Sequence, residues 1–207
     1  MRPLAASLAV SVLLAGSTAL FADPIPYPST GSTAPTVVLT AISTSINVYY
    51  DGSSAGNSDS VEIIDLTTPA DSITTAFFPN NGGTTQGAED TFTVKAGDTI
   101  VINLIDTTTS LTFSSDPALS SDGVNHAYIT PYTTSDPAVG TLATGGPNDY
   151  YVGLEDLTIP SPSDRDYNDE VLVITGVTSV PEPTSIALLG TGILGMAGIV
   201  RRRFSSR

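Results

Sequence analysis

Short apolar segments separated by turn-forming clusters run through most of this 207-residue chain. The segments are rich in Val, Ile, Thr and aromatic residues, and the clusters between them are rich in Gly, Asp, Asn and Ser. Between the two ends of the chain, no stretch sustains the period of an amphipathic helix. The segments expected to form strands are 36–42, 46–50, 61–66, 73–78, 91–94, 99–105, 110–113, 126–132, 150–154 and 171–177. This spacing predicts an all-β fold, a single jelly-roll-like β-sandwich.

The amino-acid composition between the two ends of the chain limits the functional sites that it can form. The chain contains no cysteine, which excludes disulfide bonds, thiolate metal sites and cysteine nucleophiles. Between Asp23 and Val180, 20 Asp and Glu residues stand against Lys95 and Arg165 alone. Such a charge repels nucleic acid and anionic lipid, and it attracts cations. Because the same charge also favours solubility, a role in cation binding and a role in solubility both stay open.

The N-terminus has the pattern of a secretory signal peptide. A short basic start, Met1-Arg2, precedes an apolar run over 4–14 and then small residues. Cleavage after Ala19 or after Ala22 fits this pattern, and the sequence does not choose between them. We therefore assign residues 1–22 to the signal peptide and expect the protein to be exported. Residues 23–35, rich in Pro, Ser and Thr, are expected to form a flexible lead-in to the domain.

The C-terminal segment, residues 179–207, has three parts. Val180, Pro181, Glu182 and Pro183 come first, and the two prolines hold this stretch extended. An apolar run over 184–200 follows, which at about 1.5 Å per residue spans roughly 25 Å as a helix, close to the ~30 Å of a bilayer core. The basic residues that close the segment are Arg201, Arg202 and Arg203, which should stay on the cytoplasmic side. The segment predicts a transmembrane helix.

This succession of Val-Pro-Glu-Pro, apolar helix and basic cluster resembles the PEP-CTERM sorting signal of exported bacterial proteins. The resemblance implies the secretion machinery and an exosortase as partners. It also implies at least transient anchoring in the inner membrane, then delivery to the cell surface or extracellular matrix. A permanent membrane anchor without processing is the alternative.

Two acidic blocks stand late in the expected domain, which we place at 36–178. The block at 151–157 ends in Gly153-Leu154-Glu155-Asp156-Leu157, and the block at 164–170 reads Asp-Arg-Asp-Tyr-Asn-Asp-Glu. Over residues 100–178 this order resembles a bacterial β-rich domain of unknown function that recurs in PEP-CTERM proteins. In that family the first block carries an aromatic residue where Leu154 stands, and the loop at 158–163 is glycine-rich. The resemblance brings no established activity.

The acidic blocks suggest a Ca²⁺ site. Oxygens at alternate positions of a tight loop can turn toward one hard cation. An EF-hand is excluded because Asp169 occupies the place of its glycine and Thr175 the place of its last Glu. The residues proposed to hold Ca²⁺ are Glu155, Asp156, Asp164, Asp166, Asn168 and Asp169. In the alternative, Arg165 pairs with the neighbouring carboxylates while Asp164 and Asn168 cap turns. Asp59, ahead of an early strand, serves as the control position outside this site.

No catalytic centre is recognisable, and we expect the protein not to be an enzyme. His126 is the only histidine, and no nucleophile motif accompanies any serine, so we expect a structural histidine. Three functions remain: a structural or interaction protein of the cell surface or biofilm matrix, a carbohydrate-binding module of the exopolysaccharide layer, and a secreted hydrolase of unrecognised type. Tyr132, Tyr150 and Tyr151 are the residues considered for sugar stacking, with ordinary strand tyrosines as the alternative.

Overall fold

The computed structural model describes residues 27–81, 83–132, 145–160 and 162–180. Within them the fold is all-β, as predicted, and consists of two antiparallel sheets. The predicted signal peptide and the transmembrane helix at 184–200 lie outside the described residues. In the part of the chain that the structure describes, no helix is long and apolar enough to cross a membrane.

The first sheet, sheet A, has six strands. Its order is β11–β1–β6–β3–β4, and β7 pairs with β6 beside this row. The bounds are β1 Val38–Ala41, β3 Asp59–Asp65, β4 Ile73–Phe77, β6 Thr99–Asp106, β7 Leu111–Ser114 and β11 Val177–Val180. Of two short 3-10 turns, Pro69–Asp71 lies between β3 and β4, and Pro117–Leu119 follows β7 on the way to the second sheet.

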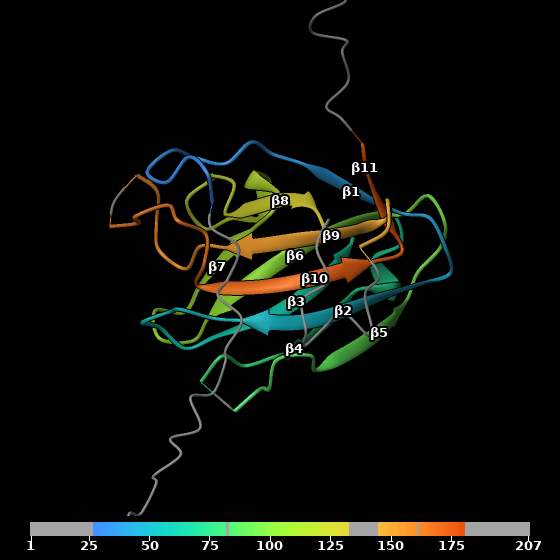
Figure 1. Cartoon of the computed structure of the whole chain (residues 1–207), viewed down its shortest axis with the longest axis horizontal. Helices are drawn as coiled ribbons and strands as arrows, with labels where there is room; N and C mark the ends of the chain where they lie inside the picture. Colours follow the sequence, from blue (N-terminus) through green and yellow to red (C-terminus); the bar gives the residue numbers. More distant parts are fainter. Residues whose placement is uncertain (1–26, 82, 133–144, 161, 181–207) are drawn as a thin grey trace, which may run out of the picture.

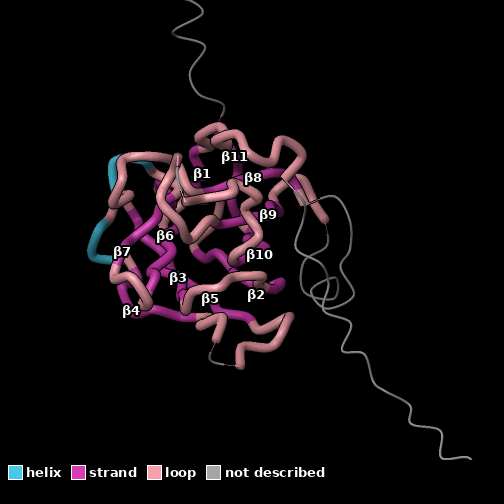
Figure 2. Tube along the Cα trace, turned by 90° about the vertical axis from the view of Figure 1, so that its left-hand side faces the viewer, coloured by secondary structure: helices cyan, strands magenta, loops and turns pink. Residues whose placement is uncertain are grey.

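The second sheet, sheet B, has five strands in the order β5–β2–β10–β9–β8. The bounds are β2 Ser45–Gly52, β5 Glu89–Thr93, β8 Ala127–Pro131, β9 Asp149–Leu154 and β10 Glu170–Thr175. Figure 1 looks onto β9, β10 and β2 of this sheet, and Figure 2 turns the molecule so that sheet A lies on the left and sheet B on the right.

The hydrophobic core lies between the two sheets. Side chains alternate across each strand, so every second residue faces the other sheet. From sheet A the core takes residues such as Val61, Ile102 and Leu104, and from sheet B residues such as Val152 and Leu172. All five side chains are fully buried. Two sheets packed around a shared hydrophobic core form the predicted β-sandwich.

Gly176 divides one predicted strand into two. The segment expected as a single strand over 171–177 is β10 in sheet B and then β11 in sheet A. Gly176 has φ +76°, a conformation that side-chain-bearing residues rarely adopt. The apolar pattern runs unbroken through this turn, which is why the sequence suggested one strand. β11 continues to Val180, which pairs with Val38 of β1.

The described part of the expected lead-in, from residue 27 on, packs on the domain. Tyr27 and Ala34 are buried with Tyr167, and the Tyr27 ring meets the Tyr167 ring edge-on at 4.9 Å between centroids. The Tyr167 hydroxyl accepts a hydrogen bond from the Ala34 amide at 2.8 Å. Asn125 donates to the Ala34 carbonyl at 2.9 Å. These partners stand at distant positions in the sequence, so composition could not reveal them.

Candidate cation-binding site

The site is built where β9 ends and the chain loops back to β10. Glu155 and Asp156 follow β9 directly, and both are buried, with exposed fractions of 0% and 2%. The Glu155 amide donates to the His126 carbonyl at 3.1 Å, and the Glu155 carbonyl lies 3.0 Å from His126 Nδ1. The backbone of Glu155 is therefore held in place on both sides.

The loop at 157–169 folds back over the end of β9 (Figure 1, left, in orange). Asp122 accepts a hydrogen bond from the Ile159 amide at 2.9 Å, which ties the start of the loop to the domain. Arg165 and Tyr167 have positive φ values of 57° and 54°, which few residues other than Gly adopt. The loop closes where the Asp156 amide donates to Asp169 Oδ2 at 2.8 Å.

This path gathers carboxylates into two overlapping groups that share Glu155. One group is Glu155, Asp164 and Asp166, and the other is Glu155, Asp156 and Asp169. Within each group the nearest oxygens lie within 4.8 Å of one another. Oxygens that bind one Ca²⁺ at about 2.3–2.6 Å are at most about 5 Å apart, so both groups have the spacing of a ligand set.

Among the residues that the structure describes, no basic side chain pairs with the buried Glu155 carboxylate. Neither of its oxygens has a hydrogen-bond partner, although the Ser163 side chain is near enough to lower its pKa. Arg165 does not pair with the acidic residues, since its guanidinium donates to the carbonyls of Gly31 and Pro160. Among the described residues, Lys95 forms an ion pair with Asp71, and the His126 ring lies beside the Asp122 carboxylate.

The crowding of carboxylates shifts their proton affinities. Burial, with the negative charges of Asp164 and Asp166, raises the pKa of Glu155 to about 7. Burial also raises the pKa of Asp169 to about 9, and Asp156 and Glu155 add to this shift. The pKa values of Asp156 and Asp166 are raised too, again mainly by burial. Each of these groups must lose its proton to bind a cation, so the site favours either protons or a cation.

The structure brings together five of the six residues predicted to hold Ca²⁺. The sixth, Asn168, lies beside them, where its amide groups donate to the Asp166 carboxylate. The alternative of an acidic loop differs from this arrangement in two respects. Arg165 donates to carbonyls and not to carboxylates. The turn is capped by Asp166, which accepts from the Asn168 amide, and not by Asp164 or Asn168. The binding of Ca²⁺ itself stays a prediction.

Sequence reasoning missed three acidic residues. Asp59 is not suitable as a control position outside the site. It begins β3, and its carboxylate interacts with that of Asp156. Glu170 begins β10 and Asp106 ends β6, and both are fully buried. The alternation of Asp59, Val61 and Ile63 was the available signal, because it places Asp59 on the core face of its strand.

A third acidic group differs from these two. Asp65, Asp71 and Asp98 also bring carboxylate oxygens within 4.8 Å of one another. However, the Lys95 ammonium lies 3.1 Å from Asp71, and the Lys95 amide donates to Asp98 at 2.8 Å. Asp65 accepts two further amide hydrogen bonds, from Thr67 and Thr68. Protein donors therefore compensate most of this group, and the one oxygen of Asp65 without a hydrogen-bond partner is Oδ2.

His126 has the surroundings expected of a structural histidine. It is fully buried, its ring packs on Phe113 at 4.4 Å, and its Nε2 lies 3.0 Å from the Asp122 carboxylate. Since Nδ1 faces the Glu155 carbonyl, both ring nitrogens are engaged. In this position the imidazole does not face solvent.

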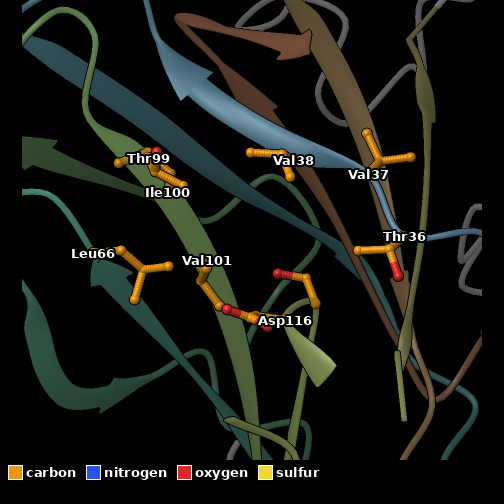
Figure 3. Close-up of a pocket in the computed structure, with 9 residues that line it drawn as sticks. Thr36, Val37, Val38, Leu66, Thr99, Ile100, Val101 and Asp116 are labelled. Carbon is orange, nitrogen blue, oxygen red and sulfur yellow. The ribbon is translucent and has the colours of Figure 1, made fainter. Parts of the chain in front are cut away.

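The tyrosines considered for sugar stacking are buried. Tyr132, Tyr150 and Tyr151 are between 1% and 7% exposed, and Tyr132 packs edge-on against Tyr151. A shallow apolar depression of about 120 Å³ lies elsewhere, beside β1 and β6, with Val38, Leu66 and Val101 in its lining (Figure 3). None of the described residues that line it is aromatic.

Two regions of the chain match known families. Residues 94–177 match the family described as Domain of unknown function (DUF4114), and residues 179–203 match the PEP-CTERM protein-sorting motif. The chain carries a PEP-CTERM sorting motif. It is therefore an exported protein that transits the membrane on an exosortase-related sorting route. No curated protein and no solved structure matches the chain.

The PEP-CTERM motif begins at the edge of the folded domain. Val180 is the last residue of β11 and lies opposite Val38 at the end of the ladder. The strand is held there by the Tyr150 hydroxyl, which accepts from the Ser179 amide at 3.0 Å. The residues from Pro181 onward lie outside the described part of the chain.

The match at 94–177 covers every residue of the two carboxylate groups that share Glu155. It does not reach Asp59, which stands in β3. Strands β1 to β5 also precede the matched residues, yet β1, β3 and β4 belong to sheet A, and β2 and β5 belong to sheet B. The sandwich of this PEP-CTERM protein is thus larger than the matched region.

Proposed function

We propose that this PEP-CTERM protein is a Ca²⁺-stabilised structural or interaction protein of the bacterial cell surface or extracellular matrix, and that it is not an enzyme. The single observation that carries the Ca²⁺ part is Glu155, a fully buried carboxylate with two unpartnered oxygens at the junction of two carboxylate groups. A buried charge without a partner is costly, and a bound cation removes that cost.

Ca²⁺ fits this donor set better than a transition metal. Every side chain that the two groups offer is a carboxylate, and hard cations prefer oxygen ligands. The groups come from a strand end and from the loop that follows it, so a cation would fasten the loop at 157–169 to β9 and β10. Such fastening suits a protein exported to surroundings that contain Ca²⁺.

Thermal unfolding of the full chain in detergent tests this proposal. At a Ca²⁺ concentration a hundred times the Kd, binding stabilises the folded state by about 2.7 kcal/mol, which corresponds to roughly 5–10 °C in Tm for a domain of this size. The Glu155→Gln variant should bind Ca²⁺ about 10- to 100-fold more weakly, because it loses one charged ligand. Equal Tm values in Ca²⁺ and in EDTA for the parent protein would end the proposal.

Glu62→Gln is the matched control. Glu62 is a neighbour of Val61 and Ile63 in β3, so its side chain lies on the outer face of sheet A, away from the core. This variant should keep the full response to Ca²⁺. A loss of response equal to that of Glu155→Gln would mean that general charge, and not the site, is responsible.

The other two functions have less support. A carbohydrate-binding module commonly presents aromatic rings to the sugar, but Tyr132, Tyr150 and Tyr151 are buried. A polysaccharide pull-down with the exported protein tests this alternative. A hydrolase based on His126 would need one free ring nitrogen, and both are engaged. A broad hydrolase screen tests that alternative.

A further inference from the structure

The third acidic group, Asp65, Asp71 and Asp98, lies far from the Glu155 site. Asp65 is the last residue of β3, Asp71 ends the 3-10 turn that follows it, and Asp98 directly precedes β6. Asp59, at the start of β3, interacts with a carboxylate of the Glu155 site. At about 3.3 Å per residue, Asp65 stands roughly 20 Å further along this strand. The third acidic group is therefore at the opposite end of sheet A.

Asp65 is the member of this group that protein donors leave incompletely compensated. The residue is only 1% exposed, and its Oδ1 accepts from the amides of Thr67 and Thr68 at 2.8 and 2.7 Å. Its Oδ2 is buried too, and this oxygen has no hydrogen-bond partner. A buried carboxylate oxygen without a partner costs free energy, and a cation beside it would remove that cost.

The positive charge near this group belongs to Lys95, and it reaches only the outer member. The Lys95 ammonium lies 3.1 Å from Asp71 Oδ2, and among the described residues it forms no ion pair with Asp65 or Asp98. The Lys95 side chain is 64% exposed, and ion pairs in such a position contribute little stability. Three carboxylates beside one ammonium leave two negative charges, which is the charge that a divalent cation neutralises.

Four side chains offer oxygens to a cation at this position. One oxygen from each of the three carboxylates lies within 4.8 Å of the others, which is the spacing of a ligand set for Ca²⁺. The Thr68 hydroxyl lies 3.5 Å from Asp98 Oδ1 and accepts from the Lys95 ammonium at 3.4 Å, so its oxygen already faces a positive charge. Ca²⁺ binds about six to eight oxygens. The Asp71 side chain is 31% exposed, so water can reach the remaining positions.

We infer that Asp65, Asp71 and Asp98 form a further Ca²⁺ site. The ion takes the place of the Lys95 ammonium, and the Thr68 hydroxyl is its fourth ligand from the protein. It fastens the connection between β3 and β4 to the segment that crosses from β5 of sheet B to β6 of sheet A. This site shares no residue with the Glu155 site, so it does not rest on the function proposed above.

Native mass spectrometry of the full chain, released from detergent after saturation with Ca²⁺, counts the bound ions. Wild-type protein should bind two. Asp71→Asn should bind one, and it should fold, because the partner of the Asp71 carboxylate is an exposed side chain. Glu155→Gln should also bind one, and the two substitutions together should leave none. Glu62→Gln is the control that keeps both ions, and Asp65→Asn is the second variant of the further site.

The outcomes separate this inference from the proposed function. One ion that is kept in Glu155→Gln and lost in Asp71→Asn supports the further site and overturns the Glu155 site. One ion with the reverse pattern overturns the further site and leaves the proposed function in place. Ions that are all retained in both Asp71→Asn and Asp65→Asn overturn the further site, as does the absence of bound ions in wild type.

Lys95→Met gives a second readout, in which binding becomes stronger. The variant keeps the length of the side chain and removes the ammonium that the ion must displace. In the Glu155→Gln background, where the further site is measured alone, calorimetric titration should show Ca²⁺ binding about two- to fivefold tighter in Lys95→Met. In the same background Asp71→Asn should bind at least about tenfold more weakly, because it loses a charged ligand. Unchanged or weaker binding in Lys95→Met would overturn a site at the ammonium position.

Discussion

The carbonyl oxygen of Tyr167 lies over Gly153 so closely that a Cβ atom at Gly153 would be only 2.3 Å from it. This contact joins the middle of the acidic loop to β9, two residues before Glu155. Real Cβ atoms do not approach an oxygen this closely, so only glycine permits the loop to lie where it does. The glycine therefore determines where Asp164 and Asp166 stand relative to Glu155.

Gly153→Ala should displace the loop and weaken Ca²⁺ binding. We expect a loss of stability of about 1–3 kcal/mol from overpacking and a Ca²⁺ affinity reduced at least about tenfold. Calorimetric titration and thermal unfolding measure the two effects. Gly56→Ala is the control, because nothing lies within 4 Å of a Cβ atom built there. Unchanged Ca²⁺ affinity in Gly153→Ala would show that the loop position does not matter for binding.

Stability without Ca²⁺ should fall as the pH rises from 5 to 9. The folded-state pKa values of Glu155, Asp59 and Asp169, about 7, 8 and 9, lie above those of the unfolded chain. The stability that these groups contribute is fully present below the unfolded pKa values near pH 4, and it is lost as the pH rises through the folded values. The Tm in EDTA should therefore decrease across this window, and Ca²⁺ should remove the decrease.

Asp59→Asn isolates one part of this pH dependence. A single carboxyl with so large a shift contributes a slope of at most about 1.4 kcal/mol per pH unit, which the variant should lose. The lowered pKa of Asp122, held down by the Ile159 amide and His126, acts only at more acidic pH. A Tm in EDTA that is constant or rises between pH 5 and 9 would contradict the assigned shifts.

Gly176→Ala should destabilise the domain through the crossing from β10 to β11. At φ +76° an alanine costs about 1–2 kcal/mol in backbone energy. Its Cβ atom would also lie 2.9 Å from the Ser45 carbonyl oxygen. Gly97→Ala, with φ +97° and open space around it, has the backbone cost alone. Denaturant unfolding should give the larger loss for Gly176→Ala, and equal losses would refute the role of the close approach.

Tyr167→Phe should release the segment that precedes β1. The variant removes the hydroxyl that accepts from the buried Ala34 amide, at a cost of about 1–3 kcal/mol for the unsatisfied donor. Hydrogen exchange should become faster at Ala34. The Ser32 amide, which donates to the Ser29 carbonyl, should keep its exchange rate. Protection of Ala34 that survives in the variant would show that packing of Tyr27 alone holds the segment.

The strands and most of their positions could be predicted from the sequence, because alternation and turn residues are local properties. The segment at 99–105 became β6 over Thr99–Asp106, and the segment at 150–154 became β9 over Asp149–Leu154. The division at Gly176 could not be predicted, since it depends on which sheet has a free edge for Val177–Val180. β1 provides that edge.

In the candidate site, too, some residues could be predicted from the sequence and others could not. Glu155 and the residues from Asp164 to Asp169 are near in sequence, so a pattern of oxygen donors suggested them. Asp59 is almost a hundred positions away from Asp156, and only the packing of sheet A on sheet B brings their carboxylates together. The bonds of Arg165 to carbonyls, and not to carboxylates, also depend on where residues 31 and 160 lie.

The order of residues alone determined the PEP-CTERM sorting motif, the excess of acidic residues and the β-rich character of this protein, because each depends on neighbours along the chain. Only the tertiary structure decided which carboxylates are buried together without a compensating charge. The physical reason is that alternation sends a residue to one face of its strand, whereas its partner on the other sheet is set by how the two sheets pack.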